Sequence, residues 1–410
     1  MERSTADGSD RHRQNRSALF HRGNTTLPHI AMVSIPAPGH VNPSLEVIRE
    51  LAARGHHVTY ANAPSYRDTV EAAGATHVPY TSLLPRDTAW PEDTIAQLDL
   101  FLRDAVSMTP QLRAAYEGRR PDLFLYDIGA APARVLAEQW AVPAIQLSPT
   151  YVAWDGYETD MAPVIEQLYA TPEGAGYQRR AEQWLRQEGI ATPHADFVGR
   201  PPRCLVLIPR ALQPHADRVN PDVYTFIGPC LGERGTWTPP AGGGKILLIS
   251  LGSAFTDQPA FYRTCLRAFG DLPGWHVILQ IGRRLSAADL GPIPANVEVH
   301  PWVEQLAILR HAGAFLTHAG MGGASEGLAC GVPMIAVPQG VDQFANADHL
   351  VALGVARRID TDAATPGLLR AALHELTTDP RVAARLSAAR HELTVEGGAH
   401  RAADLIEAAL

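Results

Sequence analysis

The chain has 410 residues, of which 46% are hydrophobic and 19% charged, and its formal net charge at pH 7 is −8. This length is typical of two or three globular domains, and an acidic chain without long Lys or Arg runs is a poor candidate for binding nucleic acid or an anionic membrane. Its four cysteines form no CxxC pair and no apolar segment has the length of a signal peptide or membrane span, so a cytoplasmic protein without disulfides or zinc is expected.

The first half of the chain alternates strands with helices after a polar start. Residues 1–27 are expected to be a disordered extension or the product of a misplaced start. The run HIAMVSI (29–35) predicts a buried strand, and Pro43 opens a helix with apolar residues at helical spacing. Further strands are predicted at 56–62, 76–80, 122–127, 143–148, 203–209 and 223–228, with helices at 66–73, 93–116 and 134–140. Residues 151–200 lose this rhythm, and only 178–188 is expected to be helical there.

The second half repeats the alternation after a break. Residues 229–244 are dense in Gly and Pro, which predicts an interdomain linker. Strands are then predicted at 245–253, 275–281, 296–300, 314–317 and 334–337, and helices at 259–269, 303–309, 324–329, 368–376, 382–393 and 401–410. Strands alternating with helices predict parallel sheets covered on both faces. The fold class is therefore α/β, with two doubly wound Rossmann-like domains at 28–228 and 245–394 and a separate C-terminal segment at 395–410.

A glycine-rich turn after the strand at 314–317 is the leading candidate for a ligand site. Ligands of parallel sheets bind beyond the carboxyl ends of the strands, where His318, Gly320, Gly322 and Gly323 are placed. Backbone N–H groups and the positive end of the following helix suit a diphosphate. The alternative is a tight turn in which the glycines only serve packing.

The same turn approximates a dinucleotide fingerprint. Gly320, Gly322 and Ser325 nearly follow GxGxxG, but that motif normally follows the first strand of its domain. No acidic residue ends the next strand either, which argues against a nicotinamide or flavin cofactor.

Polar and aromatic residues surround this turn in the sequence. Trp302 offers a face for stacking a base, Gln305 an amide, and Glu326 a carboxylate for a ribose diol. Asp342 and Gln343 offer hydrogen bonds to sugar hydroxyls. Each residue alone has an ordinary alternative: a core tryptophan, a solvated glutamate, or an aspartate that caps a helix.

The order of these residues strongly resembles the nucleotide-sugar signature of GT-B glycosyltransferases. More closely, the chain from His29 to Leu410 is similar to actinomycete macrolide glycosyltransferases of the UDP-glucosyltransferase superfamily, family 1. The stretches that carry the resemblance are PGHVNPSLEVIRELAARGH, YDIGAAPARVLA, LVLIPRALQPHADRV, SLGSAF, THAGMGG and AVPQGVDQF. Two departures are Glu304, where Pro is common, and Gly323, where some relatives have a serine that contacts phosphate.

The resemblance implies a role for each donor-site residue. The donor would be UDP-glucose, bound by the C-terminal domain, and the C-terminal helix would pack back on the N-terminal domain. The implied contacts are Trp302 on the uracil, Gln305 beside base and ribose, Glu326 on the ribose, His318, Gly320, Gly322, Gly323 and Ser253 on the diphosphate, and Asp342 and Gln343 on the sugar.

His40 and Asp127 follow strands of the first domain, on the cleft side. The resemblance makes His40 the general base on the acceptor hydroxyl and Asp127 the carboxylate that orients it. The alternatives are a solvated loop histidine and a helix cap. The implied reaction is one in-line displacement with inversion, with UDP leaving. No DxD-like pair lies near the turn, so a metal is not strictly required, and no tightly bound cofactor is expected.

The acceptor is defined less well by the sequence. Trp90, Phe101, Tyr151 and Trp154 are candidate walls of an apolar acceptor pocket, although they would equally fill a core. The resemblance implies a macrolide antibiotic glucosylated on its amino sugar and thereby inactivated. Flavonoids or other phenols are alternative acceptors, and a nucleotide-sugar epimerase or a non-catalytic nucleotide-sugar or drug-binding protein are more remote alternatives. Monomer and homodimer remain equally open.

Overall fold

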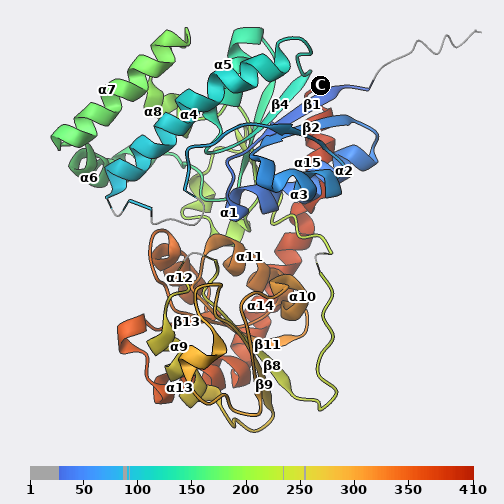
Figure 1. Cartoon of the computed structure of the whole chain (residues 1–410), viewed down its shortest axis with the longest axis vertical. Helices are drawn as coiled ribbons and strands as arrows, with labels where there is room; N and C mark the ends of the chain where they lie inside the picture. The colour runs from blue at the N-terminus through green and yellow to red at the C-terminus, as the bar shows by residue number, and fades with distance from the viewer. Residues whose placement is uncertain (1–26, 86–89, 92, 234, 254) are drawn as a thin grey trace, which may run out of the picture.

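The computed structural model describes residues 27–85, 90–91, 93–233, 235–253 and 255–410. Within these ranges the chain forms two lobes, each built on one parallel β-sheet (Figure 1). The first sheet has the strand order β3-β2-β1-β4-β5-β6-β7 and the second β10-β9-β8-β11-β12-β13. The prediction of two doubly wound α/β domains is confirmed, whereas residues 1–26 of the expected extension lie outside the described residues.

The first lobe contains the strands and helices from His29 to Phe226. Its strands are β1 (His29–Val33), β2 (His57–Asn62), β3 (Thr76–Pro79), β4 (Leu123–Asp127), β5 (Ala144–Ser148), β6 (Cys204–Val206) and β7 (Tyr224–Phe226). Its helices are α1 (Pro38–Val41), α2 (Leu45–Ala53), α3 (Arg67–Ala72), α4 (Thr94–Tyr116), α5 (Ala131–Trp140), α6 (Tyr157–Tyr169), α7 (Pro172–Gln187) and α8 (His194–Gly199). Strands β1 and β4 are buried along their whole length, as continuous apolar runs require in a sheet covered on both faces.

Residues 151–200 are more helical than the sequence predicted. They form α6, α7 and α8, and α7 begins six residues before the expected helix at 178–188. Helix α6 has no fully buried residue along its length, although Leu168 and Tyr169 pack against a core cluster of the first lobe.

The second lobe holds the remaining strands. They are β8 (Lys245–Ser250), β9 (Trp275–Gln280), β10 (Val297–His300), β11 (Ala312–Thr317), β12 (Met334–Ala336) and β13 (Ala356–Arg358). The helices of this half of the chain are α9 (Pro259–Phe269), α10 (Gln305–Leu309), α11 (Met321–Cys330), α12 (Gln343–Ala352), α13 (Pro366–Thr378), α14 (Pro380–Glu396) and α15 (Gly398–Glu407). No helix in the described part of the chain is long and apolar enough to cross a membrane.

Each sheet has a point where the strand order reverses. In the first sheet β1 lies between β2 and β4, and in the second β8 lies between β9 and β11. The loops that follow β1 and β4, and those that follow β8 and β11, therefore open the crevice in which doubly wound sheets bind ligands. The predicted site residues His40, Asp127, Ser253, His318 and Gly320 lie in or directly beside these loops.

The last helix leaves the second lobe and packs on the first. Gly397, with φ of 85°, separates α14 from α15, and α15 lies beside α2 (Figure 1). Ala402, Ala403 and Ile406 of α15 belong to the same buried cluster as β1 and α2. The chain therefore crosses between the lobes twice, once after β7 and once after α14.

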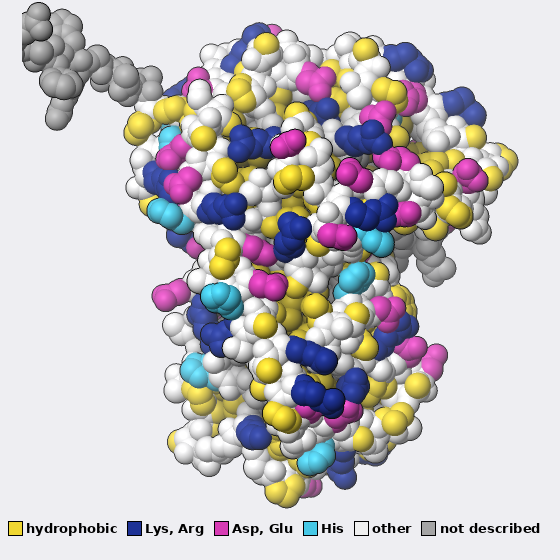
Figure 2. Space-filling view, turned by 180° about the vertical axis from the view of Figure 1, so that it is seen from behind, with side chains coloured by type: hydrophobic (Ala, Val, Ile, Leu, Met, Phe, Trp, Pro, Cys, Tyr) yellow, Lys and Arg dark blue, Asp and Glu magenta, His cyan; other side chains and the backbone are white. Residues whose placement is uncertain are grey.

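The two lobes can also be distinguished on the face opposite to that in Figure 1. Figure 2 shows a narrower waist between them, where hydrophobic side chains gather, and charges of both signs interspersed over each lobe. This mixed surface offers no extended basic face for a polyanion.

Candidate active site

His40 and Asp127 form a hydrogen-bonded pair at the carboxyl edge of the first sheet. His40 lies in the short helix α1 after β1, and Asp127 is the last residue of β4. Nδ1 of His40 is 2.8 Å from Oδ1 and 3.0 Å from Oδ2 of Asp127. The carboxylate accepts the Nδ1 proton, so Nε2 keeps its lone pair and can accept a proton. Asp127 is 1% exposed and His40 26%, which makes the imidazole the accessible partner.

The charges around His40 favour its protonated form. Burial lowers the pKa of His40, but the charge and hydrogen bond of Asp127, together with the charge of Asp342, outweigh burial and raise it above the ordinary value. Asp342 belongs to the second lobe. The two lobes therefore act electrostatically on one imidazole.

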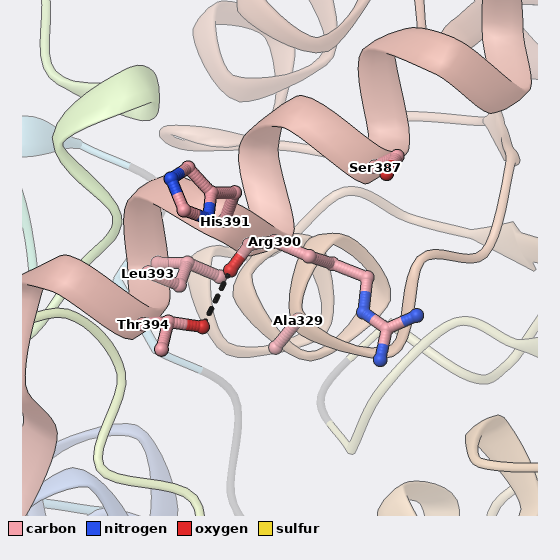
Figure 3. A pocket seen from close by; sticks show the side chains of 6 residues that line it. All are labelled: Ala329, Ser387, Arg390, His391, Leu393 and Thr394. Atoms are coloured by element: carbon pink, nitrogen blue, oxygen red, sulfur yellow. Dashed lines mark hydrogen bonds between the residues drawn. The ribbon is translucent and has the colours of Figure 1, made fainter.

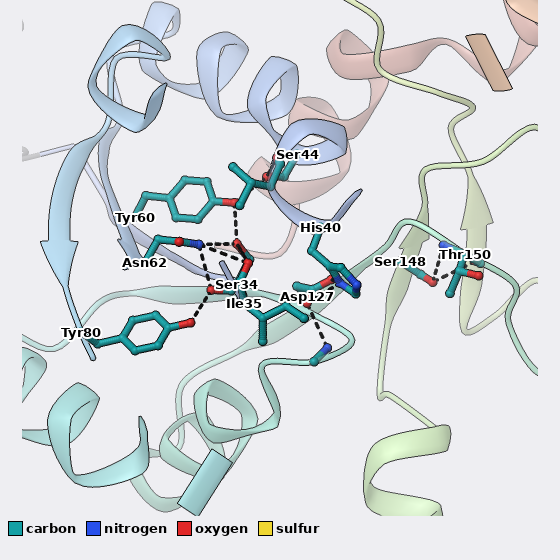
Figure 4. A network of polar contacts seen from close by, with 12 residues as sticks. Ser34, Ile35, His40, Ser44, Tyr60, Asn62, Tyr80, Asp127, Ser148 and Thr150 are labelled. Carbon is teal, nitrogen blue, oxygen red and sulfur yellow. Dashed lines mark hydrogen bonds and ion pairs between the residues drawn. The ribbon is translucent and has the colours of Figure 1, made fainter. Parts of the chain in front are cut away.

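A buried polar network holds the loop that carries His40 (Figure 4). Ser34 lies directly after β1, and its hydroxyl is 2.8 Å from the hydroxyl of Tyr60, which also contacts Ser44 Oγ at 2.9 Å. Asn62 Nδ2 and the Tyr80 hydroxyl each donate to the Ser34 carbonyl at 2.9 Å. Because these buried groups satisfy one another, the backbone leading to His40 is fixed.

His318 is enclosed by two glycines on the second lobe. A Cβ on either Gly252 or Gly320 would collide with the imidazole, so glycine at both positions lets the backbone close around the ring. Burial lowers the pKa of His318 to about 4, so the ring is neutral at physiological pH. A hydrogen bond with the Ser250 backbone opposes this decrease in pKa, and the neutral ring has one N–H to donate.

The turn after His318 leads directly into α11, for which Gly320 is the N-terminal cap. Ala319 has φ of 61°, a left-handed conformation that is uncommon outside glycine. A Cβ on Gly322 would meet nothing within 4 Å, whereas one on Gly323 would lie 3.2 Å from Thr317 Oγ1. Gly322 thus faces open space at the helix N-terminus, and Gly323 packs against the sheet.

The residues expected at base and ribose lie near this helix end. Trp302 is 53% exposed, which excludes the alternative of a core tryptophan and leaves its ring available for stacking. Gln305 in α10 donates from Nε2 to Glu326 Oε2 in α11 at 2.7 Å. Ser253 is exposed in the loop after β8, at the same edge of the sheet.

Asp342 and Gln343 begin α12 with different surroundings. Asp342 occupies the N-cap position, but its side chain makes no capping hydrogen bond, and its Oδ2 accepts from Asn346 Nδ2 at 3.0 Å. Gln343 is 3% exposed, and its Oε1 accepts the N–H groups of Gln339 and Gly340 at 2.8 and 3.2 Å. The Gln343 carbonyl oxygen is therefore engaged with the loop, while the Asp342 carboxylate is exposed toward solvent.

The predicted acceptor residues have different neighbours. Trp90 is 38% exposed and its ring lies 5.5 Å from that of Phe101, which packs on a core cluster of the first lobe. Trp154 donates to Asp160 Oδ2 at 2.7 Å and lies 4.8 Å from the His215 ring. Tyr151, the fourth candidate, contacts the second lobe instead.

Asn346 is a residue of the cleft that the sequence did not single out. It lies in α12, is fully buried, and accepts a hydrogen bond from the Tyr151 hydroxyl of the other lobe. An Asn four residues after an Asp is an ordinary helical pair. Only the three-dimensional structure shows that this pair is completed from the first lobe.

A second hollow lies apart from these residues, between α11 and α14 (Figure 3). It is lined by Ala329, Ser387, Arg390, His391, Leu393 and Thr394. None of the predicted site residues lines it. In the described ranges, no group of three or more His, Cys, Asp or Glu side chains is arranged to hold a metal ion.

Known proteins resemble the chain over nearly its whole length. The family model described as UDP-glucoronosyl and UDP-glucosyl transferase matches residues 230–400. The chain is 58% identical over 395 residues to the oleandomycin glycosyltransferase of Streptomyces antibioticus, with 94% of this chain and 92% of that protein covered. The crystal structure of the glycotransferase of kitacinnamycin has a TM-score of 0.89 and 56% identity, covering 94% and 99% of the two chains. The calicheamicin glycosyltransferase CalG4 follows with a TM-score of 0.83, 32% identity, and coverage of 94% and 98%.

Proposed function

Because the chain belongs to the UDP-glucoronosyl and UDP-glucosyl transferase family and is a glycosyltransferase, we propose that it transfers glucose from UDP-glucose to a macrolide hydroxyl with inversion. Its two lobes have the GT-B fold that the sequence resemblance implied, so that expectation is confirmed. The observation that carries the proposed chemistry is the His40–Asp127 pair on the lobe opposite the His318 turn.

His40 acts as the general base in this proposal. Its Nδ1–H is held by Asp127, so Nε2 takes the acceptor proton as the oxygen attacks the anomeric carbon. The buried Asp127 carboxylate then stabilises the imidazolium that forms. One displacement from the face opposite the leaving group inverts the configuration at that carbon.

The second lobe stabilises the departing UDP. The α11 N-terminus at Gly320 and Gly322 offers backbone N–H groups to the diphosphate, and the neutral His318 ring offers one more donor. Trp302 stacks on the uracil, and the paired Gln305 and Glu326 side chains meet the ribose. Asp342 binds the sugar hydroxyls, and Ser253 contributes to the diphosphate site.

The acceptor in this proposal is a macrolide, modified on its amino sugar, which would inactivate the drug. The name of the oleandomycin glycosyltransferase, which is 58% identical to this chain, supports a macrolide over flavonoids or other phenols. The protein would act in the cytoplasm, where UDP-glucose is made.

An acceptor-by-donor screen tests this function. Purified protein with UDP-glucose and oleandomycin should yield a product heavier by one hexose, with a β linkage from the α-linked donor. The His40→Ala variant should lose the activity, and the His391→Ala variant, altered in the hollow between α11 and α14 that no predicted site residue lines, should keep it. Turnover only with phenols would overturn the macrolide assignment, and UDP release without acceptor would favour an epimerase or hydrolase.

A further inference from the structure

Asn346 joins three groups that come from both lobes. Its Nδ2 donates to the Ala319 carbonyl at 2.9 Å and to Asp342 Oδ2 at 3.0 Å. Its Oδ1 accepts from the Tyr151 hydroxyl. Both N–H bonds and the oxygen of the buried amide are thereby used, so the side chain has one well-satisfied orientation.

The loops fastened by Asn346 contain unusual backbone. Ala319, in the His318 turn, has φ of 61°, and Val341, next to Asp342, has φ of 46°. A β-branched residue in this region is a conformational outlier, and such strain persists only where surrounding contacts hold it. The hydrogen bonds of Asn346 to Ala319 and Asp342 supply contacts of this kind on both loops.

Tyr151 brings the other lobe into this arrangement. It lies in the loop after β5 of the first lobe, and its ring is 5.8 Å from that of His349, one helical turn beyond Asn346. Its half-buried hydroxyl reaches the amide oxygen of Asn346 directly. The amide therefore has all of these hydrogen-bond partners only when the two lobes are in contact.

We propose that Asn346 is a positioning residue that holds the Asp342 carboxylate and the His318 turn in the geometry required by the donor, and that Tyr151 completes this geometry on lobe closure. The inference rests on the proposed role of Asp342 at the donor sugar. It links contact between the lobes to the geometry of the proposed donor site.

A double-mutant cycle tests the link between the lobes. Tyr151→Phe removes one hydroxyl and should lower kcat/KM for UDP-glucose about threefold to tenfold, the effect of one hydrogen bond, with unchanged affinity for UDP alone. Asn346→Ala should weaken UDP binding as well, because the Ala319 turn loses its anchor. The double variant should be no worse than Asn346→Ala, since both changes break one unit. Tyr262→Phe, which removes a buried hydroxyl without a hydrogen-bond partner in the described structure, is the matched control and should match the parent.

The pH profile separates positioning from simple destabilisation. Asp342 raises the pKa of His40, so a carboxylate released by Asn346→Ala should move the acidic limb of kcat/KM to lower pH. Three results would each overturn the inference. Tyr151→Phe could have the kcat/KM of the parent, the losses of the two single variants could add up in the double variant, or Asn346→Ala could differ from the parent only in melting temperature. A parent that binds UDP but transfers no sugar would overturn the proposed function alone. In that case the UDP affinity of Asn346→Ala still tests the inference, because the inference requires this variant to bind UDP more weakly than the parent.

Discussion

The chemistry proposed for the first lobe depends on two residues that are 87 positions apart. The sequence placed His40 and Asp127 after different strands, and a parallel sheet brings such loops to one edge. It did not reveal that the Nδ1 atom would face the carboxylate, which depends on side-chain rotamers and on the buried network at Ser34. The pair accounts for the orientation of the base and for its raised pKa.

Asp127→Asn should change both the rate and its pH dependence. Asparagine lacks the charge that stabilises the imidazolium, so kcat should fall by about 10²- to 10⁴-fold. The base works as neutral imidazole, and the parent therefore loses kcat/KM as pH falls through the raised pKa of His40. Without the carboxylate that pKa falls, and the acidic limb should move to lower pH. Rate profiles between about pH 5 and 9 measure this shift, and an unmoved limb would show that Asp127 does not tune His40.

The residues proposed for the donor site show where sequence reasoning stops. Trp302 and Asp342 are exposed in segments that follow strands of the second sheet, as a ligand site requires. The Gln343 carbonyl, however, is used by the preceding loop, and Gly323 packs against β11. Asn346 was missed because its proposed role depends on a partner in the other lobe, which no local pattern encodes.

At the scale of elements, burial decided which segments could be predicted. Strands β1 and β4 were recognised because both faces are covered, whereas α6, which has no fully buried residue, was not predicted. Helix α15 was recognisable by its own apolar stripe, but its ion pairs with α2 were not. Arg54 of the α2 C-terminus donates to Asp404 at 2.6 Å and to Glu407 at 2.8 Å.

Arg54→Ala should loosen α15 from the first lobe. The substitution leaves the neighbouring carboxylates of Glu50, Asp404 and Glu407 without their shared cation. Surface ion pairs contribute little to stability, so the effect should be local. Amide hydrogen exchange should accelerate in 398–407, and the difference from the parent should shrink at high salt. Arg67→Ala breaks an exposed pair within one helix and is the matched control. Equal exchange in both variants would show that apolar packing alone holds α15.

At the scale of the whole molecule, the lobes are joined on more than one side. Tyr151 and Asn346 meet across the cleft, and Glu396 lies at the crossing from α14 to α15. Glu396 Oε1 accepts the backbone N–H of Arg210, from the first lobe, at 3.0 Å, and its Oε2 lies beside Gly228, where a Cβ would be 2.7 Å away. Relative movement of the lobes therefore has to rearrange a buried carboxyl as well as the cleft contact.

Glu396→Gln should stabilise the molecule at alkaline pH only. Burial raises the pKa of Glu396 to about 7, with Glu392 adding to the increase and Arg210 and Arg401 opposing it. A carboxyl whose pKa is raised on folding stabilises the native state fully below its unfolded pKa, and this contribution is lost as pH rises through about 7. Glutamine keeps an oxygen for the Arg210 N–H and has no charge to bury, so it avoids this loss.

The variant should therefore melt at a higher temperature than the parent at pH 8, by an amount equivalent to about 1–3 kcal/mol, and at nearly the same temperature at about pH 4, below the unfolded pKa. Thermal unfolding at the two pH values measures the difference, and Glu117→Gln, at an exposed position of the first lobe, controls for net charge. An equal gain at both pH values would mean that folding does not raise the pKa of Glu396. A gain in melting temperature at the higher pH alone would show that ionisation of the buried Glu396 carboxyl opposes the docking of the two lobes. Glu396 lies where the chain crosses between the lobes after α14.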